Sequence, residues 1–257
     1  MDSRERQRAH FNEITPVYVQ ARKNPNHLLL KDLIWSSFFR QAKVRVDGRL
    51  NMLEAMCGTG EGLSIIRKHL TADVSYSGFD YSEEIVAVAR STNPGADIRQ
   101  ADATTYDSDG RKYDWIVLIG GLHHVYSHAQ EVIHRLSSSL DRGGYFLNFE
   151  PTQNCWLTRR VREHIYNTNA LFDEQSERGF ELGELDGMFE RARLEKVSQV
   201  YPGLLAYVLY YNPDAFPILN VGGPGLVRSI FRVDRLFWSS WIARKLSFAT
   251  ISLWRKP

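Results

Sequence analysis

The feature that most constrains this chain is a regular alternation between short apolar runs and helix-like segments over residues 50–149. Five runs have the length of buried strands: 50–55, 74–79, 96–101, 115–119 and 145–149. Three segments between them have the apolar spacing of helices: 62–70, 82–90 and 129–140. This spacing predicts an α/β fold, a doubly wound and mostly parallel sheet with helices on both faces.

The segments outside this alternation are predicted to be mainly helical. Residues 4–21 look helical but are interrupted by Pro16, and residues 27–41 carry a helix-like apolar face. After Pro151 the alternation breaks, and the pattern predicts these further elements: helices at 156–166 and 182–193, a strand at 194–201, a long helix at 226–246 and a final strand at 248–254.

Composition excludes several classes of protein. The 257 residues carry 32 Lys and Arg against 30 Asp and Glu, so the net charge of +2 gives no general reason to expect a nucleic-acid partner. Two cysteines, Cys57 and Cys155, cannot form a disulfide framework. The polar N-terminus lacks the apolar core of a signal peptide, and no apolar stretch reaches the roughly 18 residues of a spanning helix. We therefore expect a cytoplasmic protein.

The loop at residues 52–62 carries the chemistry. It follows a predicted strand and opens a helix, and its glycines allow the backbone to approach a ligand closely. Leu63 occupies the third glycine position of a dinucleotide fingerprint, and the Lys-Ser/Thr pair of a phosphate-binding loop is absent. What remains is Glu54 followed by closely spaced glycines. An acid there repels a phosphate but attracts an amino or sulfonium group.

These residues resemble the class I S-adenosylmethionine-dependent methyltransferases. Glu54, Gly58 and Gly60 match the first motif of that family, although Met56 stands where a glycine is usual. Residues 78–82 resemble the second motif, and residues 100–103 the third. Residues 113–125 are similar to the fourth strand and the loop that faces the methyl group, and residues 140–146 to the turn before the fifth strand.

The resemblance implies a seven-stranded Rossmann-like sheet, S-adenosyl-L-methionine as cofactor, S-adenosyl-L-homocysteine as product, and no metal. Asp80 is expected to hold the ribose hydroxyls and Asp102 the adenine amino group, because carboxylates accept hydrogen bonds. The residues expected to contact the cofactor are Glu54, Ala55, Gly58, Gly60, Asp80, Tyr81, Asp102, Ala103, Gly120, Tyr18 and Arg22. Four regions are implied: a helical lid at 1–45, a cofactor-binding core at 46–150, a helical substrate cap at 151–193, and completion of the sheet at 194–257 with a long amphipathic helix.

Several of these assignments have simpler alternatives. Glu54 would also suit a loop cap, Asp80 a helix N-cap, and Asp102 a turn, although Ser82 is better placed as the N-cap. Tyr18 would equally suit an ordinary surface helix.

His123 and His124 are the candidate catalytic residues. A neutral imidazole can take a proton from a hydroxyl or ammonium acceptor near pH 7, while cofactor contact or packing is the alternative. We expect methyl transfer to an O or N atom of a small molecule, such as a natural product, a sugar or a lipid-linked intermediate. Met56 keeps open a non-catalytic sensor or partner subunit that binds S-adenosylmethionine. A dinucleotide-dependent reductase is disfavoured by Leu63.

The C-terminal segment is basic and rich in aromatic residues. In the predicted helix 226–246 an apolar stripe lies apart from most of the cationic side chains; the stripe is Ile230, Val233, Leu236, Phe237, Trp241 and Leu246. Packing of this helix as a cap on the sheet is the favoured interpretation, and contact with a membrane surface or a lipid-linked substrate is the alternative. The oligomeric state is left open, with a homodimer as one option.

Overall fold

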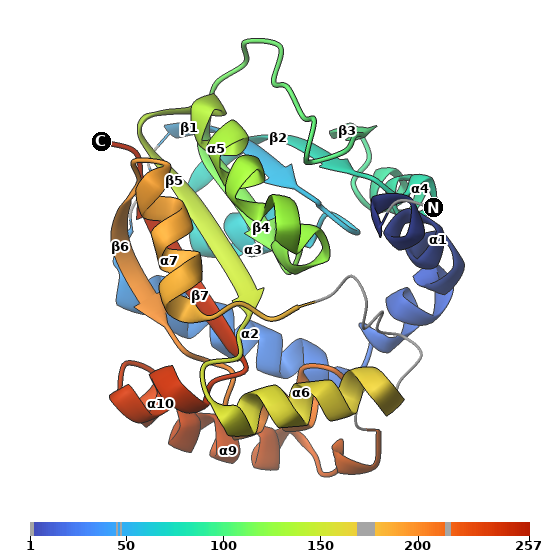
Figure 1. Ribbon diagram of the computed structural model, residues 1–257, viewed down its shortest axis with the longest axis vertical. Coiled ribbons are helices and arrows are strands. Elements are labelled where there is room, and N and C mark those ends of the chain that lie inside the picture. Colours follow the sequence, from blue (N-terminus) through green and yellow to red (C-terminus); the bar gives the residue numbers. More distant parts are fainter. Residues whose placement is uncertain (1–2, 45, 47, 169–177, 214–216) are drawn as a thin grey trace.

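The computed structural model describes residues 3–44, 46, 48–168, 178–213 and 217–257, and it shows a central sheet between two helical layers (Figure 1). The sheet has seven strands in the order β3-β2-β1-β4-β5-β7-β6, and β7 runs antiparallel to both of its neighbours. The strands are β1 (Gly48–Ala55), β2 (Ala72–Asp80), β3 (Asp97–Gln100), β4 (Tyr113–Ile119), β5 (Leu140–Pro151), β6 (Glu195–Val200) and β7 (Ala249–Arg255). The predicted mostly parallel sheet is confirmed.

The helices follow the order of the chain. They are α1 (Ser3–Ala21), α2 (Pro25–Ala42), α3 (Glu61–His69), α4 (Glu83–Thr92), α5 (Ala129–Ser139), α6 (Trp156–Thr168), α7 (Leu182–Arg191), α8 (Leu205–Tyr210), α9 (Pro224–Phe237) and α10 (Trp241–Leu246). Two 3-10 helices are η1 (Leu122–His128) and η2 (Pro217–Leu219). No helix in the described part of the chain combines the length and apolar content needed to cross a bilayer.

Aromatic side chains fill the core on both faces of the sheet. On one face Trp35 of α2 packs edge-on against Phe149 of β5, with ring centroids 5.7 Å apart. On the other face Phe189 of α7 stacks on Trp254 of β7 at 4.9 Å. Thus α2 and α7, within the regions predicted as lid and cap, belong to the layers that cover the sheet.

The structure corrects two predicted helices. Helix α1 continues through Pro16, because a proline removes one backbone hydrogen bond without obliging the chain to leave the helix. The predicted long helix 226–246 is two helices. Trp238 is buried between them and its carbonyl accepts a hydrogen bond from Tyr201 N at 3.1 Å. Ser240 then caps α10 by accepting from Ala243 N.

Candidate active site

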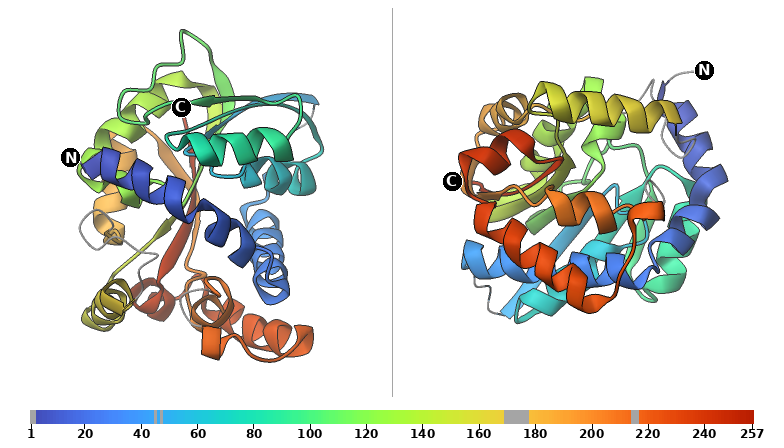
Figure 2. Two further views of the ribbon diagram at one scale, coloured as in Figure 1. Left: turned by 90° about the vertical axis from the view of Figure 1, so that its right-hand side faces the viewer. Right: turned by 90° about the horizontal axis from the view of Figure 1, so that it is seen from below.

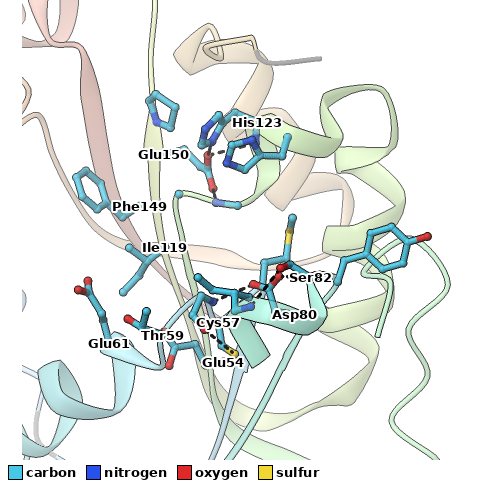
Figure 3. A pocket seen from close by; sticks show the side chains of 18 of the residues that line it. Glu54, Cys57, Thr59, Glu61, Asp80, Ser82, Ile119, His123, Phe149 and Glu150 are labelled. Carbon is cyan, nitrogen blue, oxygen red and sulfur yellow. Dashed lines mark hydrogen bonds and ion pairs between the residues drawn. The ribbon is translucent and has the colours of Figure 1, made fainter. Parts of the chain in front are cut away.

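A cavity of about 250 Å³ lies at the carboxyl ends of the central strands (Figure 3). Its walls come from the segments that follow β1, β2, β3, β4 and β5, and from residues of α1, α2, α6 and α8. Strand order reverses between β1 and β4, so their following loops diverge to opposite faces of the sheet and leave a crevice there. The topology thus places the first motif and the loop after β4 on either side of one cavity.

Asp80 joins the glycine loop to the end of β2. Its Oδ2 accepts from Gly58 N at 2.9 Å and its Oδ1 from Ser82 N at 3.2 Å. Burial raises the pKa of this carboxyl, and the backbone donors, Gly58 first, partly oppose the increase. A carboxylate has about four acceptor positions, so two bonds to the backbone leave capacity for a vicinal diol.

Asp102 and Tyr81 lie along the same wall. Asp102 Oδ1 accepts from both the amide and the hydroxyl of Thr104, each at 2.8 Å, so this residue also shapes the turn after β3. The Tyr81 hydroxyl donates to Glu5 of α1. The turn role weighed for Asp102 and its place in the cavity wall are therefore compatible.

The carboxylate of Glu54 supports the glycine loop from within. Its Oε1 accepts from Gly62 N and its Oε2 from the Tyr76 hydroxyl, both at 2.8 Å. A Cβ on Gly62 would lie 2.6 Å from the Glu54 carboxylate, so the glycine is required for this close approach. Oε1 thus holds the first turn of α3, as in the loop-cap alternative, while Oε2 is bonded to the neighbouring strand β2.

Glu54 should make stability pH dependent. Burial, the largest effect, raises its pKa to about 7 from 4.5. Between these values the folded chain holds a proton that the unfolded chain releases. The stabilisation is fully present below pH 4.5 and is lost as the pH rises through 7, by up to about 3 kcal/mol. Urea unfolding at pH 5 and at pH 8 gives the free energy of unfolding at each pH. The difference between the two values should be smaller for Glu54→Gln than for wild type. The control Glu84→Gln, at an exposed position, should show the same difference between pH 5 and pH 8 as wild type. A difference in Glu54→Gln as large as that of wild type would contradict this prediction.

Met56 adopts a left-handed backbone conformation, with φ of 51°. This conformation explains why a glycine is usual at this position. Gly121, in the loop after β4, makes room for the methionine side chain. A Cβ on Gly121 would lie 2.9 Å from both Cβ and Sδ of Met56. Met56 and Gly121 therefore form a matched pair across the cavity wall.

This pairing predicts a double-mutant result. Gly121→Ala should lower the free energy of unfolding by about 1–3 kcal/mol, because the added methyl overlaps Met56. In the Met56→Gly background the loss should be much smaller. Urea unfolding of the four proteins measures both effects. An equal loss in the two backgrounds would show that Met56 is not the obstacle.

Glu150 at the end of β5 organises the loop after β4. Its side chain is fully buried, and its Oε1 accepts from Gly121 N and Leu122 N, each at 2.9 Å. Its Oε2 accepts from His123 Nδ1 at 2.9 Å (Figure 3). Burial raises the pKa of Glu150 to about 7. This one carboxyl therefore fixes both the start of η1 and the orientation of the His123 ring.

His124 lies beside His123, with ring centroids 3.9 Å apart. Burial raises the pKa of both Glu150 and Asp80, and the positive charge that His124 carries when it is protonated partly opposes both increases. Both histidines line the cavity.

Helix α1 is tied to the second motif. Arg8 pairs with Glu83 at 2.9 Å, and the Ser82 hydroxyl donates to Asn12 at 2.6 Å. These contacts hold α1 against the rim of the cavity, where Arg8 and Ile14 contribute to the wall. Within the predicted lid, α1 and, through His27, the start of α2 border the site.

Most of the predicted site residues meet in this cavity. Its walls include Glu54, Gly58, Asp80, Tyr81, Asp102, Ala103, Gly120, Arg22, His123 and His124. Ala55 and Gly60 are not among the wall residues. Gly60, with φ of 81°, instead forms the turn that begins α3. The side chain of Tyr18 lies outside the described part of the chain.

The sequence analysis missed several wall residues. They include Glu150, Arg162, Tyr207 and Tyr211. Glu150 had a usable signal, since it is an acid at the end of a predicted strand. Arg162 donates to the carbonyls of Thr152 and Phe248, which anchors α6 beside the cavity. The rings of Tyr207, on α8, and Tyr211, directly after it, stack with centroids 4.6 Å apart, and this helix was not predicted.

Known proteins share this domain and this fold. A family model described as a methyltransferase domain matches residues 52–144. A tRNA (carboxymethyluridine(34)-5-O)-methyltransferase of Saccharomyces cerevisiae is 26% identical over 148 residues, 57% of this chain and 46% of that protein. The chain thus spans about half the length of this curated relative.

Solved structures are similar in fold. A possible histamine N-methyltransferase from Thermotoga maritima aligns with a TM-score of 0.62 and 15% identity, over 97% of this chain and 99% of that one. The cyclase SpnF aligns with a TM-score of 0.63 and 16% identity, over 100% and 97% of the two chains.

The matched domain, the strand order and the acids around the glycine loop are those of a Rossmann-like methyltransferase domain. Residues 52–144 thus match a methyltransferase domain, and the whole chain has the fold of the S-adenosylmethionine-dependent methyltransferases to which it is similar.

Proposed function

We propose that this chain moves the methyl group of S-adenosylmethionine to an O or N atom of a small molecule, with His123 as the general base. One observation carries the proposal: a histidine fixed by a fully buried glutamate faces the glycine loop and Asp80 across one cavity (Figure 3). A base in this place suits an acceptor that must lose a proton when it is methylated.

The residues of the cavity fit the cofactor. Gly58 presents its backbone in a left-handed conformation, where an added Cβ would meet nothing within 4 Å. Asp80 would accept from the ribose hydroxyls and Asp102 from the adenine amino group. Gly58 and Gly120 would lie along the methionine moiety of the cofactor. The bound cofactor supplies an electrophilic methyl on a sulfonium, which is already a good leaving group.

The role of His123 follows from its hydrogen bond. In the tautomer whose Nδ1–H donates to Glu150, the lone pair lies on Nε2. Nε2 then takes the proton that an acceptor hydroxyl or ammonium loses as it gains the methyl group. Glu150 is the positioning residue, because it holds the ring and stabilises the imidazolium that forms.

The walls support a small acceptor. Ile14, Arg162 and Tyr207 bring three helices, α1, α6 and α8, around the site. Such enclosure suits a small substrate better than a folded RNA. The yeast relative is named for O-methylation of a tRNA uridine, which supports oxygen as the acceptor atom. We do not infer a tRNA substrate for this chain from that name.

Methyl-labelled S-adenosylmethionine tests the proposal. The full chain is incubated with the small-molecule fraction of a cell extract or, separately, with total tRNA, and labelled products are counted. The proposal expects label in the small-molecule fraction together with release of S-adenosylhomocysteine. Label that enters tRNA alone would contradict it, and binding of the cofactor without product in either fraction would favour the non-catalytic sensor.

A further inference from the structure

Helices α9 and α10 expose a set of apolar side chains. Leu236 is 81% exposed and Trp241 is 72% exposed. The set, called here the α9–α10 face, is Leu226, Val233, Leu236, Phe237, Trp241, Ile242 and Leu246. The apolar stripe predicted from the sequence is therefore mostly on the outside, which is the reverse of what packing as a cap requires.

The side of α9 that packs on the protein is a different one. Val227, Phe231 and Trp238 are buried at spacings of four and seven residues. The exposed residues Leu226, Val233 and Phe237 repeat at seven and four residues along an adjacent side. Helix α9 is thus apolar on two sides. One side is buried against the rest of the protein, and the other is exposed.

A cationic row accompanies the exposed apolar row. Arg228, Arg232 and Arg235 are exposed and recur at four and three residues, and Arg244 and Lys245 follow on α10. The only acid between residues 217 and 248 is Asp234, which is buried and accepts from Ala206 N at 2.6 Å. The exposed surface of this segment therefore carries positive charge beside apolar side chains.

The position of this face relates it to the cavity. Helices α6, α9 and α10 form one layer on the side toward which the carboxyl ends of the central strands point (Figure 2). Trp156 at the start of α6 is 71% exposed. Arg162, later on α6, and Tyr207 of α8, which packs on α9, both line the cavity. A flat partner on this side would lie close to the active site.

We propose that the α9–α10 face docks on an anionic membrane surface. Exposed apolar side chains next to a cationic row match the two contributions to interfacial binding, which are insertion of apolar groups and attraction to anionic headgroups. A second copy is a poorer occupant, because a two-fold contact of this face with itself brings two cationic sets together without an exposed acid between them. This docking goes beyond methyl transfer and does not depend on it.

Vesicle co-sedimentation of the full chain tests the docking. Wild type should sediment with vesicles of phosphatidylcholine and phosphatidylglycerol, and less with phosphatidylcholine alone. The Leu236→Glu/Trp241→Glu variant should bind at least about tenfold more weakly. The Arg232→Gln/Arg235→Gln variant should lose about fivefold for each arginine at low salt.

Val197→Glu is the matched control, since Val197 is 43% exposed on β6 and not part of the α9–α10 face. It should bind like wild type, and thermal unfolding should show that every variant is folded. The proposal is overturned if wild type stays in the supernatant with the mixed vesicles, or if Leu236→Glu/Trp241→Glu leaves binding unchanged. It is equally overturned if those two changes convert a dimer to a monomer and vesicles are not bound.

Discussion

Replacing His123 with alanine is expected to lower kcat by about 10²- to 10⁴-fold while leaving the affinity for S-adenosylmethionine within about twofold of wild type. The change removes the proposed proton acceptor but leaves Asp80 and the glycine loop in place. Rates of S-adenosylhomocysteine release with an acceptor found as above, together with calorimetric titration of the cofactor, measure the two quantities. His134→Ala, an exposed histidine on α5, is the matched control.

The Glu150→Gln variant tests the positioning role of Glu150 separately from the general-base role of His123. The amide keeps the shape of the side chain but places an NH₂ where the carboxylate accepts backbone N–H groups. We expect a kcat between those of wild type and His123→Ala. We also expect the acidic limb of the pH–rate profile, on which the base is protonated, to shift to lower pH, because a neutral amide stabilises the imidazolium less than a carboxylate does. Full activity in His123→Ala would remove His123 as the base. An unshifted profile in Glu150→Gln would remove Glu150 as the group that tunes it.

Asp80→Ala is expected to weaken binding of S-adenosylmethionine by at least about 100-fold, since two hydrogen bonds to a charged acceptor are lost. Calorimetric titration measures the affinity directly. Asp73→Ala is the control, because Asp73 is exposed near the opposite end of the same strand. Unchanged affinity in Asp80→Ala would reject the assignment of Asp80 to the ribose.

The sheet could be predicted because buried parallel strands have a strong sequence signal. The apolar runs at 50–55, 74–79 and 115–119 end within one residue of β1, β2 and β4. Motifs at the ends of such runs must meet at one edge of the sheet, which is why Asp80, Asp102 and His123 line one cavity.

The remaining features depend on contacts between distant segments. Glu150 acts on a loop nearly 30 residues earlier in the chain, so local pattern gives only an acid after a strand. The break after α9 depends on burial of Trp238 and on its hydrogen bond with Tyr201, while apolar and basic residues continue past it. Likewise, the outward orientation of Leu236 depends on which side of α9 is covered by α2 and α8.

A crystal structure of the full chain with S-adenosylhomocysteine tests the central claim most directly. The account predicts ribose hydroxyls within hydrogen-bond distance of Asp80, the adenine amino group beside Asp102, and the sulfur facing His123. Density for the ligand elsewhere, or with Asp80 and Asp102 pointing away from the nucleoside, would contradict it.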